Sequence, residues 1–222
     1  MKTYRRHYYN VFSSFYDRFV SLHSADKEGR LRKLLSNASP LEKGDVALDL
    51  CTGTGAMLHY LCNKVGPKGM VIGSDFSHGM LKEGLKKTRS LENVLLVESD
   101  AAYLPFKSHI FDAVTCAYAF YELQGDAQDK MLKEVIRVLK PGHPFLVMEH
   151  DLPESMLIRI LLYIRLLSMG LRRAIDILKY EKDILERYFV KVEKISLPKG
   201  RSKILVCWTD LAAYSKQART NK

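Results

Sequence analysis

The feature that most constrains the fold is a regular alternation of short apolar runs with longer segments of helical spacing. Runs without polar alternation suit strands that are buried on both faces, and helices between them allow these strands to run parallel. We therefore expect an α/β fold in which a mostly parallel sheet carries helices on both faces. The five strands expected from this pattern span residues 46–50, 70–73, 94–97, 111–117 and 145–148.

The chain before the first strand is expected to be helical. Residues 8–20 and 27–36 carry apolar positions at helical spacing, so residues 1–40 are expected to form an N-terminal helical cap. With 222 residues, 47% of them hydrophobic, the chain can bury one substantial core, which favours a single domain over 1–222. The basic tail, 212–222, is expected to be disordered.

The pattern changes after the fifth strand. A helical spacing that begins near residue 154 predicts a helical insertion, 152–187, over the side of the sheet where a substrate would bind. Two β-like runs follow, 190–197 and 203–208, and the Pro198-Lys199-Gly200 segment between them favours a turn. Together they can close the sheet as a hairpin, which gives seven strands with the last one antiparallel.

Composition restricts the class of partner without choosing one. A formal net charge of +10 favours anionic partners, namely nucleic acid, acidic lipid headgroups or an anionic small molecule. A solvated basic surface explains the same charge, so both interpretations stay open. The four cysteines lie in apolar stretches without zinc-ligand spacing, so we expect reduced core residues and no metal site. The first residues lack the apolar run of a secretory signal, and a cytoplasmic protein is expected.

The most informative segment is Asp49-Leu50-Cys51-Thr52-Gly53-Thr54-Gly55-Ala56, which follows an expected strand and opens a helix. Glycines there let the backbone approach a ligand closely, and the helix N-terminus offers unpaired N–H groups. Asp75 follows about 20 residues later at a strand end, where a carboxylate can accept hydrogen bonds from both ribose hydroxyls. Leu58 replaces the third glycine of the dinucleotide fingerprint, and Asp49 would repel a pyrophosphate. This set predicts a nucleoside cofactor that carries a cationic amino group.

Five successive motifs resemble those of the class I S-adenosylmethionine-dependent methyltransferases. They lie in order at 49–55, 73–77, 99–106, 111–114 and 137–142, across about half of the chain. With the aromatic segment Phe15-Tyr16-Asp17, the pattern is similar to the branch that includes the ubiquinone/menaquinone C-methyltransferases. Cys51 stands where many class I members have glycine, which is compatible with that branch. The resemblance implies a Rossmann-like sheet and S-adenosyl-L-methionine as the cofactor.

The resemblance also implies roles for the residues at the first two strand ends. Asp49, Thr52, Gly53 and Gly55 would hold the methionine end of the cofactor. Asp75 would accept hydrogen bonds from the ribose hydroxyls.

Further residues would hold the adenine. Phe76 would flank the ring, and Met80 would line it unless Met80 is a core methionine of its helix. Asp100 would accept a hydrogen bond from the adenine amino group, with Ala101 offering its backbone N–H. The alternative for Asp100 is that it caps a loop.

The remaining candidates concern the sulfonium and the acceptor. Cys116 and Ala117 would lie against the sulfonium, and Tyr16 would close the site from the cap or pack in it. Methyl transfer is an in-line displacement, so placement and water exclusion can supply most of the catalysis. A base helps where the acceptor must lose a proton, and His150 is the expected base, with Tyr121 as the second catalytic candidate. A structural hydrogen-bonding role is the alternative for His150.

The segment 155–167 is strongly apolar, yet arginines interrupt it too often for a membrane span. One interpretation is a lid or oligomer helix that covers the acceptor pocket. The other is an interfacial helix that gives peripheral membrane contact through 155–173, because basic residues beside an apolar face favour anionic membranes.

We therefore expect an enzyme that transfers a methyl group to a small-molecule or lipid-like, quinol-type acceptor. The sequence is also compatible with assembly into a homo-oligomer. A nucleic-acid (RNA or DNA) methyltransferase is the first alternative, suggested by the charge. Against it, Ala117-Tyr118-Ala119-Phe120 replaces the Asn/Asp-Pro-Pro-aromatic motif of base-amino methylation, so nucleic acid is not the expected partner. A non-catalytic scaffold that binds S-adenosylmethionine is the second alternative, and the intact cofactor motifs argue against it. Asp49 disfavours an NAD-dependent dehydrogenase.

Overall fold

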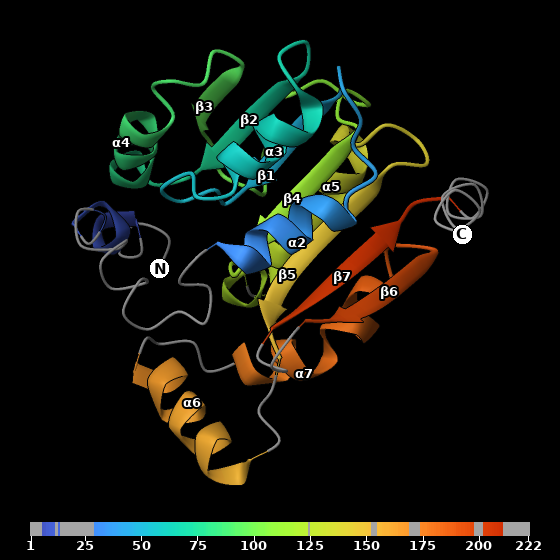
Figure 1. The fold of residues 1–222 in the computed structure, drawn as a ribbon. Coiled ribbons are helices and arrows are strands. Elements are labelled where there is room, and N and C mark those ends of the chain that lie inside the picture. The colour runs from blue at the N-terminus through green and yellow to red at the C-terminus, as the bar shows by residue number, and fades with distance from the viewer. Residues whose placement is uncertain are drawn as a thin grey trace.

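The computed structural model describes residues 6–11, 13, 29–123, 125–151, 155–168, 174–197 and 202–210. Seven strands form one sheet in the order β3-β2-β1-β4-β5-β7-β6 (Figure 1). The strands are β1 (Val46–Leu50), β2 (Met70–Asp75), β3 (Val94–Glu98), β4 (Ala113–Ala117), β5 (Pro144–His150), β6 (Lys191–Ser196) and β7 (Ser202–Trp208). The helices are α2 (Arg30–Ala38), α3 (Leu58–Val65), α4 (His78–Lys87), α5 (Asp126–Val138), α6 (Met156–Ser168), α7 (Ala174–Leu185) and the 3-10 helix η1 (Phe120–Glu122).

The sheet has one antiparallel strand. β7 runs antiparallel to both of its neighbours, β5 and β6, whereas the other neighbouring pairs are parallel. The prediction of a Rossmann-like, seven-stranded sheet with an antiparallel last strand is confirmed. Because β1 lies between β2 and β4, the chain order reverses there, and ligands of open α/β sheets bind outside the carboxyl ends of the strands at such a point.

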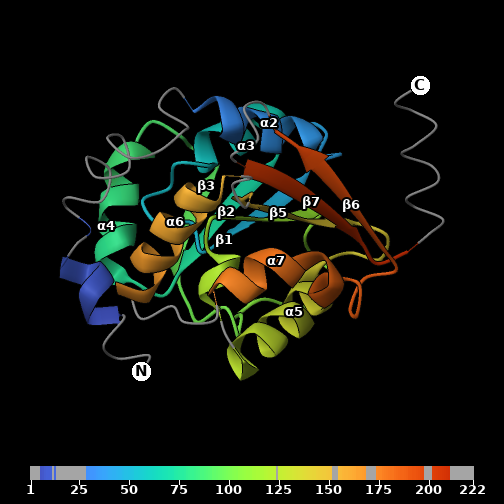
Figure 2. The ribbon, with the colours of Figure 1, turned by 90° about the horizontal axis from the view of Figure 1, so that it is seen from below.

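Alternating side chains of the central strands pack into two hydrophobic layers, one on each face of the sheet. Leu48 and Phe145 face the layer that holds α5 and α7, whereas Ala47 and Leu146 face the layer that holds α2 and α3. Figure 2 shows these two pairs of helices on opposite sides of the sheet. Burial on both faces explains why these strands read as continuous apolar runs in the sequence.

Several predicted boundaries differ from the structure. The strand expected at 111–117 begins at Ala113, because the Phe111 N–H donates to Val138 at the end of α5. The described part of the helical insertion expected over 152–187 contains two helices, α6 and α7. Within the expected N-terminal cap, residues 6–11 and 13 are helical, and α2 is the second helix. The tail 212–222 lies outside the described residues.

A buried ion pair joins α7 to the antiparallel strand. Lys203 of β7 is buried, forms a short ion pair with Glu181 of α7, and donates to the Leu178 carbonyl at 2.9 Å. Asp151 lies 3.5 Å from the same ammonium group. A lysine inside an apolar strand is costly to bury unless it is paired, so this contact fixes α7 against the sheet.

Replacing Lys203 by Met should lower the free energy of unfolding by about 3–5 kcal/mol at pH 8, because Glu181 is left as an uncompensated buried charge. Burial raises the pKa of Glu181 to about 7, so the loss should be smaller at pH 5, where the carboxyl group is neutral. Urea denaturation followed by circular dichroism measures both values. Lys194→Met is the matched control: its ion pair with Asp151 is 2.9 Å long but the lysine side chain is 41% exposed, and a loss of about 1 kcal/mol or less is expected. Equal losses in the two variants would contradict the assignment.

Candidate functional site

The carboxyl ends of β1, β2, β4 and β5 bring most of the predicted residues to one edge of the sheet. The turn after β1 contains three residues in the left-handed region: Cys51 (φ 56°), Gly53 (φ 57°) and Gly55 (φ 75°). A Cβ added at Gly53 would meet no atom within 4 Å, whereas one at Gly55 would lie 3.1 Å from Leu58 Cδ1. The turn is therefore open at Gly53 and closely packed against α3 at Gly55.

Asp49 is buried beneath this turn. Its two carboxylate oxygens accept hydrogen bonds from Thr52 Oγ1 at 2.6 Å and from Thr115 Oγ1 at 2.7 Å. Burial raises the pKa of Asp49 to about 6, against the opposing effect of these two bonds. Thr115 was not among the predicted residues, and its only signal is a polar residue within the apolar β4 run, opposite Asp49 in the β1–β4 register.

Asp75 is buried at the end of β2 and contacts the same turn. Its oxygens accept hydrogen bonds from the backbone N–H of Gly53 at 2.8 Å and of Ser77 at 2.9 Å. Burial raises the pKa of Asp75 to about 6, and the nearby carboxylates of Glu122 and Asp49 act in the same direction. Two of the three acidic residues predicted for the cofactor, Asp49 and Asp75, therefore both contact one backbone turn.

The four residues predicted for the adenine lie beyond Asp75. Met80 is buried in the first turn of α4, and Phe76 is half-buried. Asp100 Oδ1 accepts the Ala102 N–H at 3.0 Å, so this oxygen caps a loop, which was the alternative for Asp100. Ala101 is buried in that loop.

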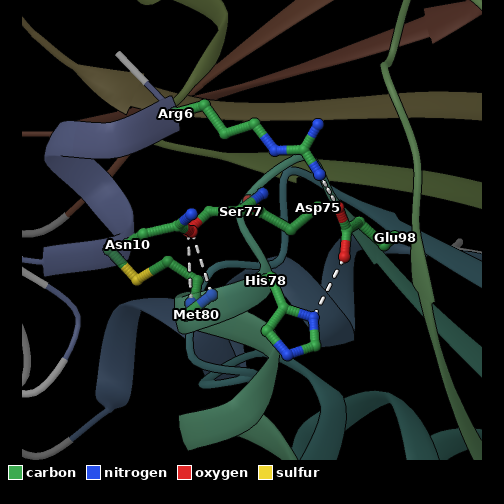
Figure 3. Close-up of polar contacts among 8 residues, drawn as sticks. Arg6, Asn10, Asp75, Ser77, His78, Met80 and Glu98 are labelled. Atoms are coloured by element: carbon green, nitrogen blue, oxygen red, sulfur yellow. Dashed lines mark hydrogen bonds and ion pairs between the residues drawn. The ribbon is translucent and has the colours of Figure 1, made fainter. Parts of the chain in front are cut away.

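The N-terminal helix docks on this end of the site (Figure 3). Asn10 Oδ1 accepts hydrogen bonds from Ser77 Oγ at 2.7 Å and from the Gly79 N–H at 3.0 Å, at the start of α4. Arg6 and His78 both reach Glu98 at the end of β3, and the His78 contact is 3.1 Å long. A Cβ at Gly79 would lie 2.6 Å from the Asn10 carbonyl oxygen, so glycine permits the close approach.

Tyr9, on the same helix, contacts the turn after β4. Its hydroxyl donates to Glu122 at 2.8 Å, and its ring meets Phe76 edge to face at 5.8 Å between centroids. Tyr16, the residue predicted to close the site, lies outside the described residues. The contacts of Tyr9 and Asn10 join segments far apart in the sequence, so no local motif pointed to them.

Cys116 and Ala117 end β4 beside the turn. The neighbouring Cys51 side chain, together with burial, raises the pKa of the Cys116 thiol well above its ordinary value. Cys116 is therefore a neutral thiol at physiological pH. Cys51 occupies a left-handed position that usually favours glycine.

An aromatic cluster surrounds the predicted base. The His150 ring lies 4.8 Å from the Tyr118 ring and 6.0 Å from the Tyr121 ring, measured between centroids. The Tyr118 hydroxyl contacts Ser202 Oγ at 2.9 Å, and Ser202 pairs with His150 across β5 and β7. The structure thus brings the two predicted catalytic residues together and adds Tyr118.

Buried Glu149 supports this cluster from behind. Its Oε1 accepts the Phe120 N–H at 2.7 Å, which holds η1 in place, and among the described residues its Oε2 has no hydrogen-bond partner. Burial, followed by the charge of Glu181, raises the pKa of Glu149 well above its ordinary value. Burial therefore favours the neutral form of this carboxyl group.

Known proteins resemble the chain over this region. The model of the ubiE/COQ5 methyltransferase family matches residues 2–183. A demethylmenaquinone methyltransferase of Staphylococcus aureus (strain JH9) is 40% identical over 141 residues, which is 64% of this chain and 58% of that protein. The chain therefore spans less than two thirds of the curated relatives that it matches.

Two solved structures share the fold. An S-adenosylmethionine-dependent methyltransferase from Aquifex aeolicus has a TM-score of 0.64 at 22% identity, over 82% of this chain and 94% of that one. A structure from Methanococcus maripaludis, described as an S-adenosyl-L-methionine-dependent methyltransferase, has a TM-score of 0.65 at 17% identity, over 90% and 94%. At these identities the likeness shows the fold. Because the family model spans most of its length, the chain belongs to the ubiE/COQ5 methyltransferase family, a family of S-adenosylmethionine-dependent methyltransferases.

Proposed function

We propose that this protein transfers the methyl group of S-adenosylmethionine to a small-molecule or lipid-like acceptor of the quinol type. One observation carries the proposal: two buried carboxylates, Asp49 and Asp75, flank a single left-handed turn at the point where the strand order reverses. The name of the Staphylococcus aureus relative, a demethylmenaquinone methyltransferase, supports a quinol-type acceptor.

The residues present fit this cofactor. The open space at Gly53 leaves room for a ligand to approach the backbone, with Thr52 and Gly55 fixing the turn on either side. Asp49 is hydrogen-bonded by neutral hydroxyl groups, so its negative charge suits the cationic methionine end. Asp75 presents two oxygens that now accept N–H groups and that suit ribose hydroxyls equally well.

The rest of the cofactor would extend along the same edge. Phe76 and Met80 would contact the adenine, and Asp100 with the Ala101 N–H would read its amino group. Cys116 and Ala117 would lie against the sulfonium, where neutral thiol and methyl groups cost a cation little beyond its lost water. The bound cofactor supplies a methyl carbon that is already activated for displacement.

The aromatic cluster is the proposed acceptor end of the site. His150 would take the proton from an acceptor hydroxyl, so that the electron pair gained by the acceptor forms its bond to the methyl carbon. The cofactor held by Asp49 and Asp75 would supply that methyl carbon, and the electron pair of its C–S bond would stay on the thioether product. The rings of Tyr118 and Tyr121 lie beside the imidazole and would exclude water from it.

Replacing Asp75 by Asn should weaken S-adenosylmethionine binding by about 1.5–3 kcal/mol, because charge-assisted hydrogen bonds to the ribose are lost. Isothermal titration calorimetry measures the change. Asp45→Asn is the control, since Asp45 is a half-buried residue at the opposite end of β1 whose carboxylate accepts the Glu42 N–H at 2.7 Å. Unchanged affinity in the Asp75 variant would refute the ribose assignment.

The affinity for S-adenosylmethionine should rise with pH and level off above about 6. Asp49 and Asp75 both have a pKa of about 6 in the free protein, so each is mostly neutral below that pH and must ionise to bind a cation or two hydroxyl groups. Below pH 6 the affinity should fall by about tenfold per pH unit for each group that must ionise. Calorimetry from pH 5 to 8 measures the slope. Asp49→Asn should lower the affinity at pH 8, and the pH dependence of the affinity should lose the contribution of one ionising group. An unchanged pH dependence would contradict the role of Asp49.

His150→Gln should lower kcat by about 10²–10⁴-fold while leaving the Kd of S-adenosylmethionine unchanged, as expected for loss of a general base. Methyl transfer to a short-chain quinol provides the rate, and calorimetry provides the Kd. His59→Gln, at an exposed position of α3, is the control. Cofactor binding by the intact protein without transfer to any acceptor class would instead support the non-catalytic scaffold.

A further inference from the structure

We infer that α6 docks this protein onto an anionic lipid bilayer, with its apolar side chains in the headgroup region. The inference rests on the proposed function, because a lipid-like acceptor resides in the membrane. The structural evidence for it comes from α6 itself.

The described apolar side chains of α6 are unusually exposed to solvent. Six large apolar residues between 156 and 164 are 44–76% exposed: Met156, Leu157, Ile160, Leu161, Tyr163 and Ile164. Contiguous apolar patches of this kind are rare on the free surface of a soluble protein and mark an interaction site.

The six described apolar residues share one side of the helix. At about 100° per residue, their positions fall within an arc of about 160° around the helix. Arg159 lies just beyond one border of this arc. Positions 158, 162 and 166 fall outside the arc and are also apolar in the sequence, so α6 is apolar around most of its circumference. An exposed apolar helix that carries basic residues suits a membrane interface.

The charge of the segment selects the kind of membrane. From residue 155 to residue 175 the sequence contains Arg159, Arg165, Arg172 and Arg173 and no Asp or Glu. Juxtamembrane basic residues are attracted to anionic headgroups, and the net charge of +10 acts in the same direction. A protein partner would have to combine an apolar groove with acidic borders, which an anionic bilayer already offers.

The described part of α6 is shorter than the apolar core of a bilayer is thick. Its 13 residues extend about 20 Å, whereas the hydrocarbon core of a bilayer is about 30 Å thick. No helix in the described part of the chain is long and apolar enough to cross a membrane.

The position of α6 relates the docking surface to the site. Figures 1 and 2 place α6 beyond the carboxyl ends of the strands, the edge that carries the aromatic cluster of His150. A lid closed over that cluster would bury its apolar side chains, but the described ones are exposed. Docking through α6 therefore turns the acceptor end of the site toward the lipid.

Co-sedimentation with vesicles tests the inference. The protein should bind phosphatidylglycerol-containing vesicles at least tenfold more tightly than pure phosphatidylcholine vesicles, and added salt should weaken the binding. The triple variant Leu157→Gln/Ile160→Gln/Leu161→Gln keeps good helix formers and should lose at least tenfold in vesicle binding. The matched control is Leu85→Gln/Leu95→Gln/Val190→Gln, which removes exposed apolar residues elsewhere and should bind vesicles normally.

Activity separates this inference from the proposed function. The α6 variant should keep its S-adenosylmethionine affinity and its turnover of a water-soluble short-chain quinol, and should lose turnover of a long-chain quinol embedded in vesicles. Normal vesicle binding by the α6 variant, or none by the intact protein, would overturn the inference. So would a change from dimer to monomer in the ultracentrifuge with vesicle binding unaltered, because α6 would then be an interface between copies. Vesicle binding without methyl transfer in any arm would overturn the proposed function alone.

Discussion

The site depends on a buried carboxylate that is held by neutral groups. Asp49 lies inside the sheet edge, where the hydroxyls of Thr52 and Thr115 satisfy its oxygens without neutralising it. One hydroxyl comes from the turn that follows β1 and the other from the neighbouring strand β4. The same interaction therefore sets the shape of the turn and joins two strands where the strand order reverses. It also holds the negative charge of Asp49 in a buried place, where solvent screens it less than at the surface.

The antiparallel end of the sheet supports the opposite end of the site. Lys203 fixes α7 through Glu181, and the charge of Glu181 reaches Glu149 behind the aromatic cluster. Glu149 in turn holds the Phe120 N–H and with it the turn that carries Tyr121. A buried ion pair that stabilises the fold thus also sets the electrostatic surroundings of the residues next to the proposed base.

The sequence predicted the fold well because burial on both faces leaves a clear pattern in β1, β4 and β5. The position of the glycine turn and Asp49 at the end of β1 could likewise be predicted, since they lie within one local segment. Thr115, Tyr9 and Asn10 could not, because their contacts depend on strand register or on segments that meet only in the folded chain. The pattern alone does not divide the helical insertion into α6 and α7, because apolar spacing runs through the residues of both helices.

The docking of the N-terminal helix against α4 depends on the order in which the elements fold. Asn10 lies almost 70 residues before its partners, Ser77 Oγ and the Gly79 N–H, which are in place only once β2 and α4 have formed. Docking of Asn10 therefore closes a long loop, and contacts of this kind form late because their entropic cost is high. The helix that carries Asn10 is thus expected to add to this half of the sheet only after β2 and α4 have assembled.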